Sequence, residues 1–520
     1  MVNLKERPKI YKIHRSTAIS ILSWNTRHPA PVLLLVCLAA GMGVSLLPTS
    51  PHQTLFGWIL AGAAGVLCLI WGGLSLTKRL PGWGHGVFWW GIGFFLRLRF
   101  ILHFPYWVMQ HDVLTFDGEK GHAGYILYLY KCGHLPDFDV RTVWQYYHPP
   151  LHHLLCAGWM RVGNVLNLSD AQVYESIQAL PFAYSCLLLA VFGLLLRELG
   201  LSGRAFVIPF SVMAVHPSQI ILAGSLNNDV LSILFMLLSL LLAIRWFRVP
   251  EMHTILCLAL TIGLGMFTKL SAWMAAPAAA MLFLCKLAQT HDFTGLSKLW
   301  KQFAGFGAVS IPIGLFWSVR NLAGWGIPPA YIPRLAEDNG QYVGNHPIWE
   351  RLFGCSPQQF VYIYDCFTIY GQSYNEYNPL IALLKTAVFD EFVNTDRFPA
   401  VRGFGDALFW TQVLLAAWAL FAMIRVLRRA DSRPEIAALP VTYAVVLGFY
   451  ILFCLRYPHT CTQNFRYAVP TLYCSLACFG LFLQETKPPA WMRVTVSVLA
   501  GCFVGLSGLL YGGLLYVNPV

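Results

Sequence analysis

The most regular feature of the sequence is the recurrence of long apolar runs separated by short polar segments. An α-helix of such a run is long enough to cross a hydrocarbon core of ~30 Å, and it satisfies its backbone hydrogen bonds internally. We therefore expect an all-α polytopic membrane protein. The pattern predicts thirteen spanning helices, at residues 30–49, 54–77, 86–107, 179–196, 204–224, 229–247, 254–268, 270–288, 303–322, 405–427, 437–455, 466–484 and 491–516.

The composition of the chain supports the same fold class. Of the 520 residues, 57% are hydrophobic and only 12% are charged, and the mean hydropathy is +0.56. Soluble proteins carry a charge on roughly a quarter of their residues, so an ordinary soluble fold is excluded. The net charge of +12 is accompanied by no DNA- or RNA-binding motif, and we predict no nucleic-acid partner.

The distribution of basic residues predicts the orientation of the chain in the bilayer. More than half of the 36 Lys and Arg residues fall in a tail at 1–29 and in alternate loops between the predicted spans. The positive-inside rule assigns these segments, and hence the N-terminus, to the cytoplasm. The two longest loops, 108–178 and 323–404, then lie on the extracytoplasmic side.

Some apolar segments are better explained as amphipathic helices on the membrane surface. Residues 149–167 could form a fourteenth span, but His152 and His153 interrupt the run, and a crossing here would move later basic loops to the outside. We therefore predict a helix at the outer interface. Helical spacing of apolar residues predicts two more short helices in the long loops, at Gly121–Cys132 and Asn378–Phe392.

Candidate catalytic residues follow the third predicted span. Asp112 and Asp117 come where the chain leaves the bilayer, so either carboxylate could accept a proton from a hydroxyl, or Asp112 could merely end the helix. His148 precedes two prolines that fix an extended entry into the next helix, so it is either a turn residue or a site residue. A divalent metal held by His111, Asp112 and His148 is possible by ligand type, although no short ligand spacing supports it.

Further charged residues are expected at extracytoplasmic helix ends. Lys269 lies between two apolar runs with almost no loop, Arg320 ends a span, and Arg466 begins one. Each cation could anchor its helix at the interface or bind a phosphate group. Asp229, at the start of a span, is either an N-cap or a partner of these cations. Because three cations recur at one membrane level, we interpret them as a site for an anionic group.

The order of these motifs resembles the C-type integral-membrane glycosyltransferases (GT-C). The closest resemblance is to the dolichyl-phosphate-mannose protein mannosyltransferase-like branch (family 39-like), which includes the bacterial lipid A aminoarabinose transferase. It covers residues 86–484, so the two helices within 30–85 look like an addition, and 485–520 hold a C-terminal span. The motifs are an aspartate after an early span, a surface helix, His148-Pro-Pro-Leu, Asn228-Asp229, Thr268-Lys269 and Phe465-Arg466-Tyr467-x-x-Pro470.

The resemblance implies that a sugar is transferred from a polyprenyl-phosphate-linked donor to an extracytoplasmic acceptor, with inversion at the anomeric carbon. The acceptor could be a protein, a glycan or a lipid. Short loops favour a bacterial plasma membrane, with the endoplasmic reticulum membrane as the alternative. Implied roles are Asp112 as general base, His148 near the donor phosphate, Lys269, Arg320 and Arg466 as its ligands, and Asp229 as their support.

Alternatives to this interpretation concern both the base and the activity. Relatives often show Asp-Glu or Asp-Asp where this chain has His111-Asp112, so Asp117 stays a candidate base. A transporter or flippase for a polyprenyl-linked or anionic substrate would need broken helices or polar residues at mid-membrane. Only Arg97 and Arg99 stand out within a span. A glycan polymerase or ligase is a further possibility.

Overall fold

The computed structural model describes residues 29–47, 52–365, 374–428, 433–486 and 488–517. All but the last residue of the predicted tail at 1–29 lies outside these ranges. Regular structure in the described part of the chain is helical, apart from one isolated bridge between Tyr342 and His459. The all-α prediction is therefore confirmed.

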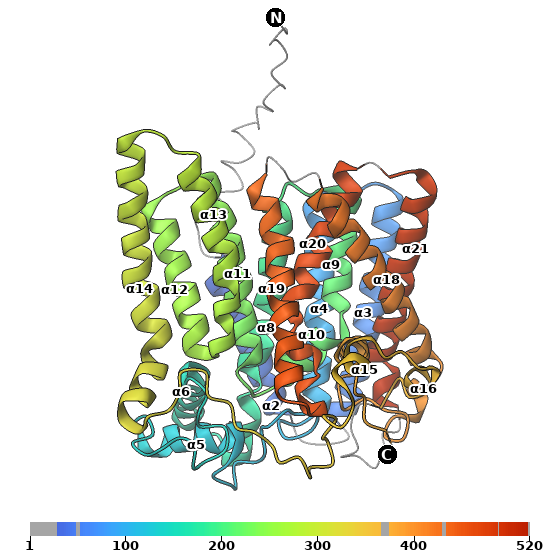
Figure 1. Ribbon diagram of the computed structural model, residues 1–520. Coiled ribbons are helices and arrows are strands. Elements are labelled where there is room, and N and C mark those ends of the chain that lie inside the picture. Colours follow the sequence, from blue (N-terminus) through green and yellow to red (C-terminus); the bar gives the residue numbers. More distant parts are fainter. Residues whose placement is uncertain (1–28, 48–51, 366–373, 429–432, 487, 518–520) are drawn as a thin grey trace, which may run out of the picture.

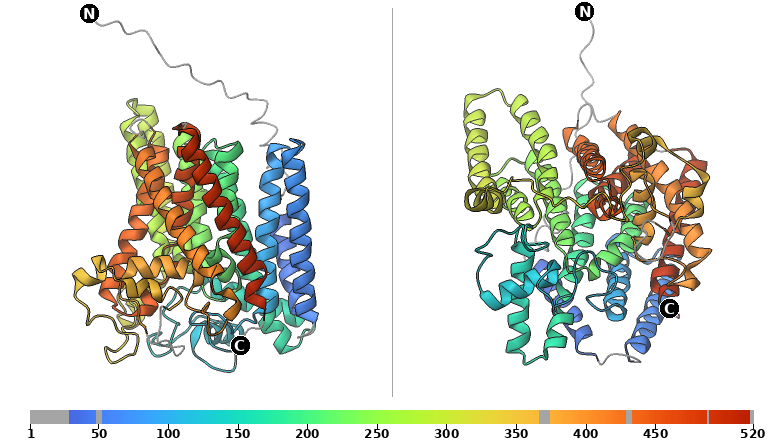
Figure 2. Two further views of the ribbon diagram at one scale, coloured as in Figure 1. Left: turned by 90° about the vertical axis from the view of Figure 1, so that its right-hand side faces the viewer. Right: turned by 60° about the horizontal axis from the view of Figure 1, so that its bottom comes forward.

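The long helices run side by side and form one bundle (Figures 1 and 2). Every predicted span falls on one of these helices, or on a helix joined to a short neighbouring helical segment. The bundle helices are α2 (Pro29–Ser45), α3 (His52–Leu76), α4 (Gly82–His103), α8 (Ala179–Glu198), α9 (Gly203–Val215), α10 (Pro217–Ile221), α11 (Asp229–Arg248), α12 (Met252–Thr268), α13 (Ala276–Ala288), α14 (Phe293–Trp325), α18 (Phe404–Leu427), α19 (Pro434–Arg456), α20 (Val469–Glu485) and α21 (Ala490–Gly512).

The number of helices that qualify as spans is lower than the thirteen predicted. Within the described residues, eight helices are long and apolar enough to cross a membrane, or ten if each of two bent pairs forms one span. The three other predicted spans are the 17-residue helices α2 and α12 and helix α4, which carries Arg97 and Arg99. The polytopic prediction holds, with eight to ten spans by length and composition.

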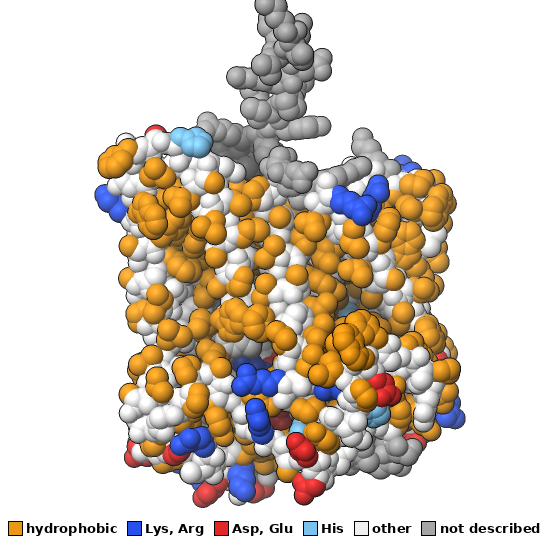
Figure 3. All heavy atoms as spheres, viewed as in Figure 1, with side chains coloured by type: hydrophobic (Ala, Val, Ile, Leu, Met, Phe, Trp, Pro, Cys, Tyr) orange, Lys and Arg blue, Asp and Glu red, His pale blue; other side chains and the backbone are white. Residues whose placement is uncertain are grey.

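The outer surface of the bundle is that of a protein surrounded by lipid. Figure 3 shows hydrophobic side chains covering the middle of the bundle, while most charged side chains lie toward its two ends. Helix α3 is the extreme case, because none of its most apolar stretch is buried against the rest of the protein. Such exposure of apolar residues is stable only in a hydrocarbon environment.

One end of the bundle, here called the loop face, carries the described parts of residues 104–178 and 326–403 (lower end in Figure 1). Helix α5 spans Gly121–Cys132, as predicted, and ends at Gly133 in the left-handed conformation. Helix α6 (Leu151–Val165) lies beside α5 at this end and does not cross the bundle. The other helices of the loop face are α7 (Asp170–Ser176), α15 (Ile348–Phe353), α16 (Pro357–Val361) and α17 (Pro379–Phe389).

Helix α17 forms where a surface helix was expected, but it is buried. It packs against α10, α18 and the 3-10 turn η6 (Phe465–Tyr467), and most of its residues are inaccessible. Apolar spacing predicts the helix correctly, yet it cannot tell whether lipid or protein covers the apolar side. Here α17 ties the second long loop to the C-terminal helices.

Two helices of the bundle are interrupted by a bend. Helices α9 and α10 meet at 54°, and the segment Thr460–Tyr467 meets α20 at 42°. The first break lies at Pro217, whose ring nitrogen cannot donate a helical hydrogen bond. Arg97 donates to the carbonyl of Ala214 beside this break, over 2.8 Å. The second break brings Arg466 to the loop face.

Candidate active site

Four of the charged residues predicted from the sequence meet at the loop face, and we call them the charge cluster: Asp112, Asp229, Lys269 and Arg466. The Arg466 guanidinium lies between two carboxylates, with Nη2 3.1 Å from Asp112 Oδ2 and Nη1 3.6 Å from Asp229 Oδ2. Lys269 Nζ pairs with the second oxygen of Asp229. Asp229 thus holds both cations, and Arg466 links them to Asp112.

Each member of the cluster comes from a different break in the chain. Asp229 begins α11, and its backbone N–H donates to Asn227 Oδ1 over 3.0 Å. Lys269 follows α12 in an extended conformation before the next helical turn. Asp112 lies in the loop after α4 with φ of 60°, a left-handed conformation that aspartate tolerates better than most residues. These residues therefore lie at helix ends or in a loop, where the chain can bring their side chains together at one site.

The members of the cluster differ in their exposure to solvent. The side chains of Arg466 and Asp229 are 6% and 3% exposed, and that of Lys269 is 15% exposed. Asp112 is 34% exposed, so it forms the open side of the cluster. Arg466 Nε is buried without an acceptor among the described residues, which leaves the guanidinium a donor for a further oxygen.

Tyr467 supports both cations of the cluster. Its hydroxyl accepts a hydrogen bond from Arg466 Nη2 over 2.6 Å. Its ring also lies 4.7 Å from the Arg466 guanidinium and 4.9 Å from Lys269 Nζ, distances at which the ring face attracts a cation. Tyr467 belongs to the Phe-Arg-Tyr motif of the sequence, but its contact with Lys269 could not be read from that motif.

His148 lies at the start of α6 as predicted, directly before Pro149 and Pro150. Its ring stacks on His122 with the centroids 5.4 Å apart, and His122 Nδ1 lies 2.8 Å from His153 Nε2. Burial holds the pKa of His148 well below its usual range, and the positive charges of Lys269 and Arg466 lower this pKa further. His148 is therefore a neutral imidazole beside the cluster at neutral pH.

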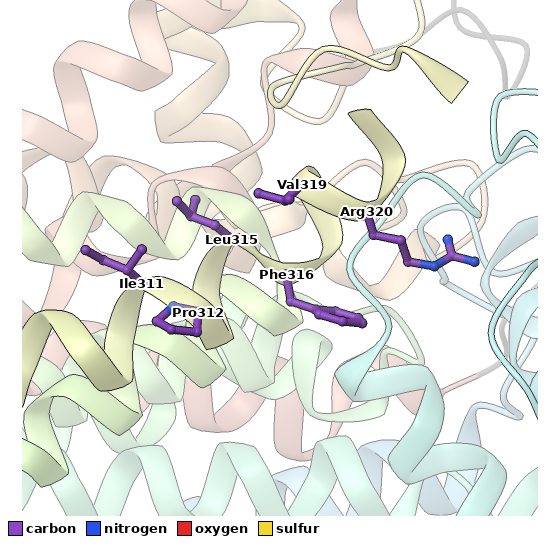
Figure 4. A pocket seen from close by; sticks show the side chains of 6 residues that line it. All are labelled: Ile311, Pro312, Leu315, Phe316, Val319 and Arg320. Atoms are coloured by element: carbon purple, nitrogen blue, oxygen red, sulfur yellow. The ribbon is translucent and has the colours of Figure 1, made fainter. Parts of the chain in front are cut away.

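Arg320 and Asp117 do not join the cluster. Arg320 donates to the carbonyl of Pro136 and lies over the rings of Trp317 and Trp325. It borders an apolar groove on α14 and extends to the same side of the helix as Phe316 (Figure 4). Asp117 is exposed to solvent five residues beyond Asp112. Arg320 and Asp117 were predicted as site residues together with Arg466 and Asp112, but they lie outside the charge cluster.

The proposed metal ligands are not brought together. His111 is turned away from His148, because its Nε2 lies 2.9 Å from Asp390 Oδ1 and its Nδ1 lies 2.7 Å from Glu391 Oε1. Among the described residues, no group of three or more His, Cys, Asp or Glu side chains is arranged to hold a metal ion.

Asp390 and Glu391 were not among the site residues predicted from the sequence. Burial opposes protonation of His111, but the charges of Asp390 and Glu391 outweigh it and raise the pKa of His111 to about 9. Asn464 Nδ2 also donates to Asp390 Oδ1 over 2.6 Å. The acidic pair ends α17, and only the burial of that helix directs it toward His111. No local pattern could have predicted this contact.

Comparison with known proteins was made for the sequence and for the fold. No known protein family and no curated protein matches the sequence. Among solved structures, the oligosaccharyltransferase of Archaeoglobus fulgidus, in complex with Zn and sulfate, is similar with a TM-score of 0.45 and 17% identity over 82% of this chain and 52% of that one. This chain therefore spans about half the length of that enzyme.

Two structures of ArnT from Cupriavidus metallidurans are also similar. The apo structure has a TM-score of 0.33 and 15% identity, over 72% of this chain and 74% of that one. The structure bound to undecaprenyl phosphate has a TM-score of 0.34 and 14% identity, over 76% and 77%. With TM-scores below 0.5, the function has to be argued from the residues of this chain itself. Its fold and charge cluster define a helical membrane protein with an ionic site at one end.

Proposed function

We propose that this chain is an integral-membrane glycosyltransferase of the GT-C type, which transfers a sugar from a polyprenyl-phosphate-linked donor to an acceptor at the loop face. The observation that carries the proposal is the contact between the half-exposed Asp112 carboxylate and the buried Arg466 guanidinium. A base and an anion-binding cation in one contact are the minimum that this chemistry needs. The order of motifs along the sequence agrees with it.

In this proposal, Arg466 and Lys269 bind the phosphate of the donor. Negative charge builds up on the lipid phosphate as its bond to the sugar breaks. Fixed cations in a water-poor site then stabilise the transition state more than the ground state. The buried Arg466 Nε–H, which has no acceptor among the described residues, is available to a phosphate oxygen. Asp229 keeps both cations in position.

Asp112 is the proposed general base. In the structure it is held by Arg466, and a donor phosphate would compete for the same guanidinium. Binding of the donor would then release the Asp112 carboxylate on the open side of the cluster, where an acceptor hydroxyl or amine can approach. Asp117 lacks this connection to the cations, which favours Asp112 over Asp117.

His148 and Arg320 have lesser proposed roles. His148, as a neutral imidazole, can donate or accept a hydrogen bond beside the phosphate without adding charge. Arg320 lies next to an apolar groove on the outer surface of α14, where it can contact a lipid headgroup. We assign it no part in the phosphate site.

We also propose that the loop face is extracytoplasmic and that the membrane is a bacterial plasma membrane. The positive-inside rule supports the orientation, because the basic loops of the sequence fall at the opposite end of the bundle. The solved ArnT structure holds undecaprenyl phosphate, and a lipid of this class is the donor carrier that we propose here.

Transport is the second candidate, because two bent helix pairs occur in the described residues and discontinuous helices are typical of transporters. The break at Pro217 lies toward the loop face, however, since only Pro217–Gly224 follow it within the bent pair. The buried Arg97 donates to Ser185 and to the carbonyls of Gly93 and Ala214, bonds that join α4 to α8 and α9. Its Nη2 has no acceptor among the described residues, but no second ionic side chain contacts it there.

A reconstituted assay separates these functions. The purified chain in liposomes is given a monosaccharide polyprenyl phosphate together with candidate acceptors, and the free polyprenyl phosphate and the glycosylated product are measured. We expect both to appear together, and only when an acceptor is present. Movement of the lipid between leaflets without cleavage would identify a transporter, and growth of a polyprenyl-linked glycan would identify a polymerase.

A further inference from the structure

A second ionic group lies next to the charge cluster, formed by His111, Asp390 and Glu391. Each ring nitrogen of His111 faces one carboxylate, at 2.9 Å and 2.7 Å. The His111 side chain is 3% exposed, and that of Glu391 is 14% exposed. His111 is the direct neighbour of Asp112, so this group and the open side of the cluster share one backbone segment.

Glu391 also acts on Arg466. The guanidinium lies within the electrostatic influence of three carboxylates, those of Asp112, Asp229 and Glu391. Glu391 contacts His111, which precedes Asp112, and Asp112 contacts Arg466. A Glu391 carboxylate that is not neutralised would therefore add negative charge beside the cation that the donor phosphate needs.

The backbone of Asp390, in this group, is held in an unfavourable conformation. Asp390 has φ of 54° and ψ of −149°, a region that is populated almost only by glycine. Asp112 has a positive φ as well. The ion pair with His111 and a hydrogen bond from Asn464 hold Asp390 in place. Strain of this kind persists only where the surrounding contacts determine it, and it is concentrated at functional sites.

We infer that His111, as a cation bound by Asp390 and Glu391, is a positioning residue that withholds Glu391 from Arg466 and so keeps Arg466 available to an anionic lipid phosphate. This inference rests on the proposed function. Without a positive charge at position 111, two carboxylates would stand uncompensated at 2.9 Å and 2.7 Å from its ring. Glu391, the more accessible of the two, would then act on Arg466, a cation that already lies within its electrostatic influence.

The pH dependence follows from the groups that face His111, which are Asp390, Glu391 and Arg466. The pKa of His111 is raised to about 9 in the folded protein. Its charge is therefore present at neutral pH and is lost as the pH rises through about 9. Affinity for a lipid phosphate is expected to decline over the same interval, because deprotonated His111 no longer neutralises Glu391.

The test is a double-mutant cycle with the full chain in detergent and undecaprenyl phosphate as the probe. H111Q is expected to weaken binding about tenfold, which is the effect of losing one charge-assisted contact. E391Q removes the competitor, so the double variant H111Q/E391Q is expected to bind as tightly as the wild type. His134→Gln is the matched control, because His134 lies exposed on the same loop. Binding of the control should be unchanged.

A purely structural role for His111 would give additive effects in this cycle, with no recovery in the double variant, and that result would overturn the inference. If H111Q does not fold, E391Q alone decides. Its lipid affinity should stay constant between about pH 8 and about pH 10, an interval centred on the His111 pKa, while that of the wild type declines. A parallel decline in both would also overturn the inference. Absence of any binding by the wild type would instead count against the proposed function.

Discussion

Two ionic groups at the loop face, the Glu376–Lys385 pair and the charge cluster, differ in how completely their polar atoms are hydrogen-bonded. Glu376 and Lys385 form a pair at 2.7 Å, and both side chains are 0% exposed. Gln359 donates to Glu376 Oε1, and the Lys385 ammonium lies over the ring of Tyr374. The charge cluster has a partly exposed carboxylate at Asp112 and a buried Arg466 Nε–H with no acceptor in the described part of the chain.

The difference separates a structural ion pair from a site. Burial of a pair with its hydrogen bonds satisfied fixes two segments to each other, here α17 and the chain that precedes it. A pair that keeps a free donor and an open side can exchange one partner for a ligand. An ionic contact alone therefore does not identify a site. The charge cluster differs because a buried donor without an acceptor lies beside a partly exposed carboxylate.

The largest expected effect is on catalysis by Asp112. Asp112→Asn keeps the shape of the side chain and its contact with Arg466 but removes the basic oxygen. We expect kcat to fall by about 10³-fold or more, the range for loss of a general base, with the thermal unfolding temperature unchanged. Rates of sugar transfer and melting curves measure the two effects. Asp137→Asn, an exposed aspartate of the same loop, is the control, and equal rates for both variants would contradict the assignment.

The buried pair of Glu376 and Lys385 should affect stability rather than catalysis. Glu376→Gln leaves the Lys385 ammonium buried without its counter-charge, which costs about 3–5 kcal/mol of folding stability. The melting temperature should therefore fall markedly. The rate of sugar transfer at a temperature where the variant stays folded should change little. A large loss of kcat in folded Glu376→Gln would remove the distinction between the two groups.

Arg466→Lys keeps the charge of the cluster but removes the planar guanidinium that reaches Asp112 and Asp229 together. We expect about a 10²-fold loss in kcat/KM, because a lysine ammonium cannot reproduce a bidentate contact with a phosphate. Arg141→Lys, in an exposed pair with Asp139 on the same loop, is the matched control. Similar kinetics for the two lysine variants would show that charge alone suffices at position 466.

The smallest expected effect is at Arg320, whose partners are a backbone carbonyl and two tryptophan rings. Arg320→Gln should change kcat/KM by no more than about threefold, in the range of an interface contact of ~0.5 kcal/mol. Kinetics with the long-chain donor would test this. A loss as large as that of Arg466→Lys would extend the phosphate site to α14.

The sequence predicted the helices far better than it predicted the contacts between them. Apolar runs placed a helix at every predicted span, although only eight to ten of these helices qualify as spans. Apolar spacing also gave the limits of α5, because a helix is a local property of the chain. Asp112 and Arg466 are 354 positions apart, and their pairing depends on how the bundle packs. Their motif context suggested a common site, but it suggested Arg320 equally well.

The contacts of His111 could not be predicted from the local sequence. His111 looked like a metal ligand and Asp390 like the end of a surface helix, yet the burial of α17 turns them into an ion pair. Lys385, in the same helix, is also buried. The sequence does not predict this, because lysine is almost never fully buried unless it is paired. The partner that permits this burial, Glu376, could be found only from the fold.

The position of the lipid phosphate in a complex is the most direct test of the proposed site. A cryo-electron microscopy map of the full chain with a bound polyprenyl phosphate would show that position. We predict phosphate oxygens within hydrogen-bonding distance of Arg466 and Lys269, with Asp112 separated from Arg466. A phosphate bound at Arg320 on the outer surface of α14, with the contact between Asp112 and Arg466 intact, would contradict the proposed site.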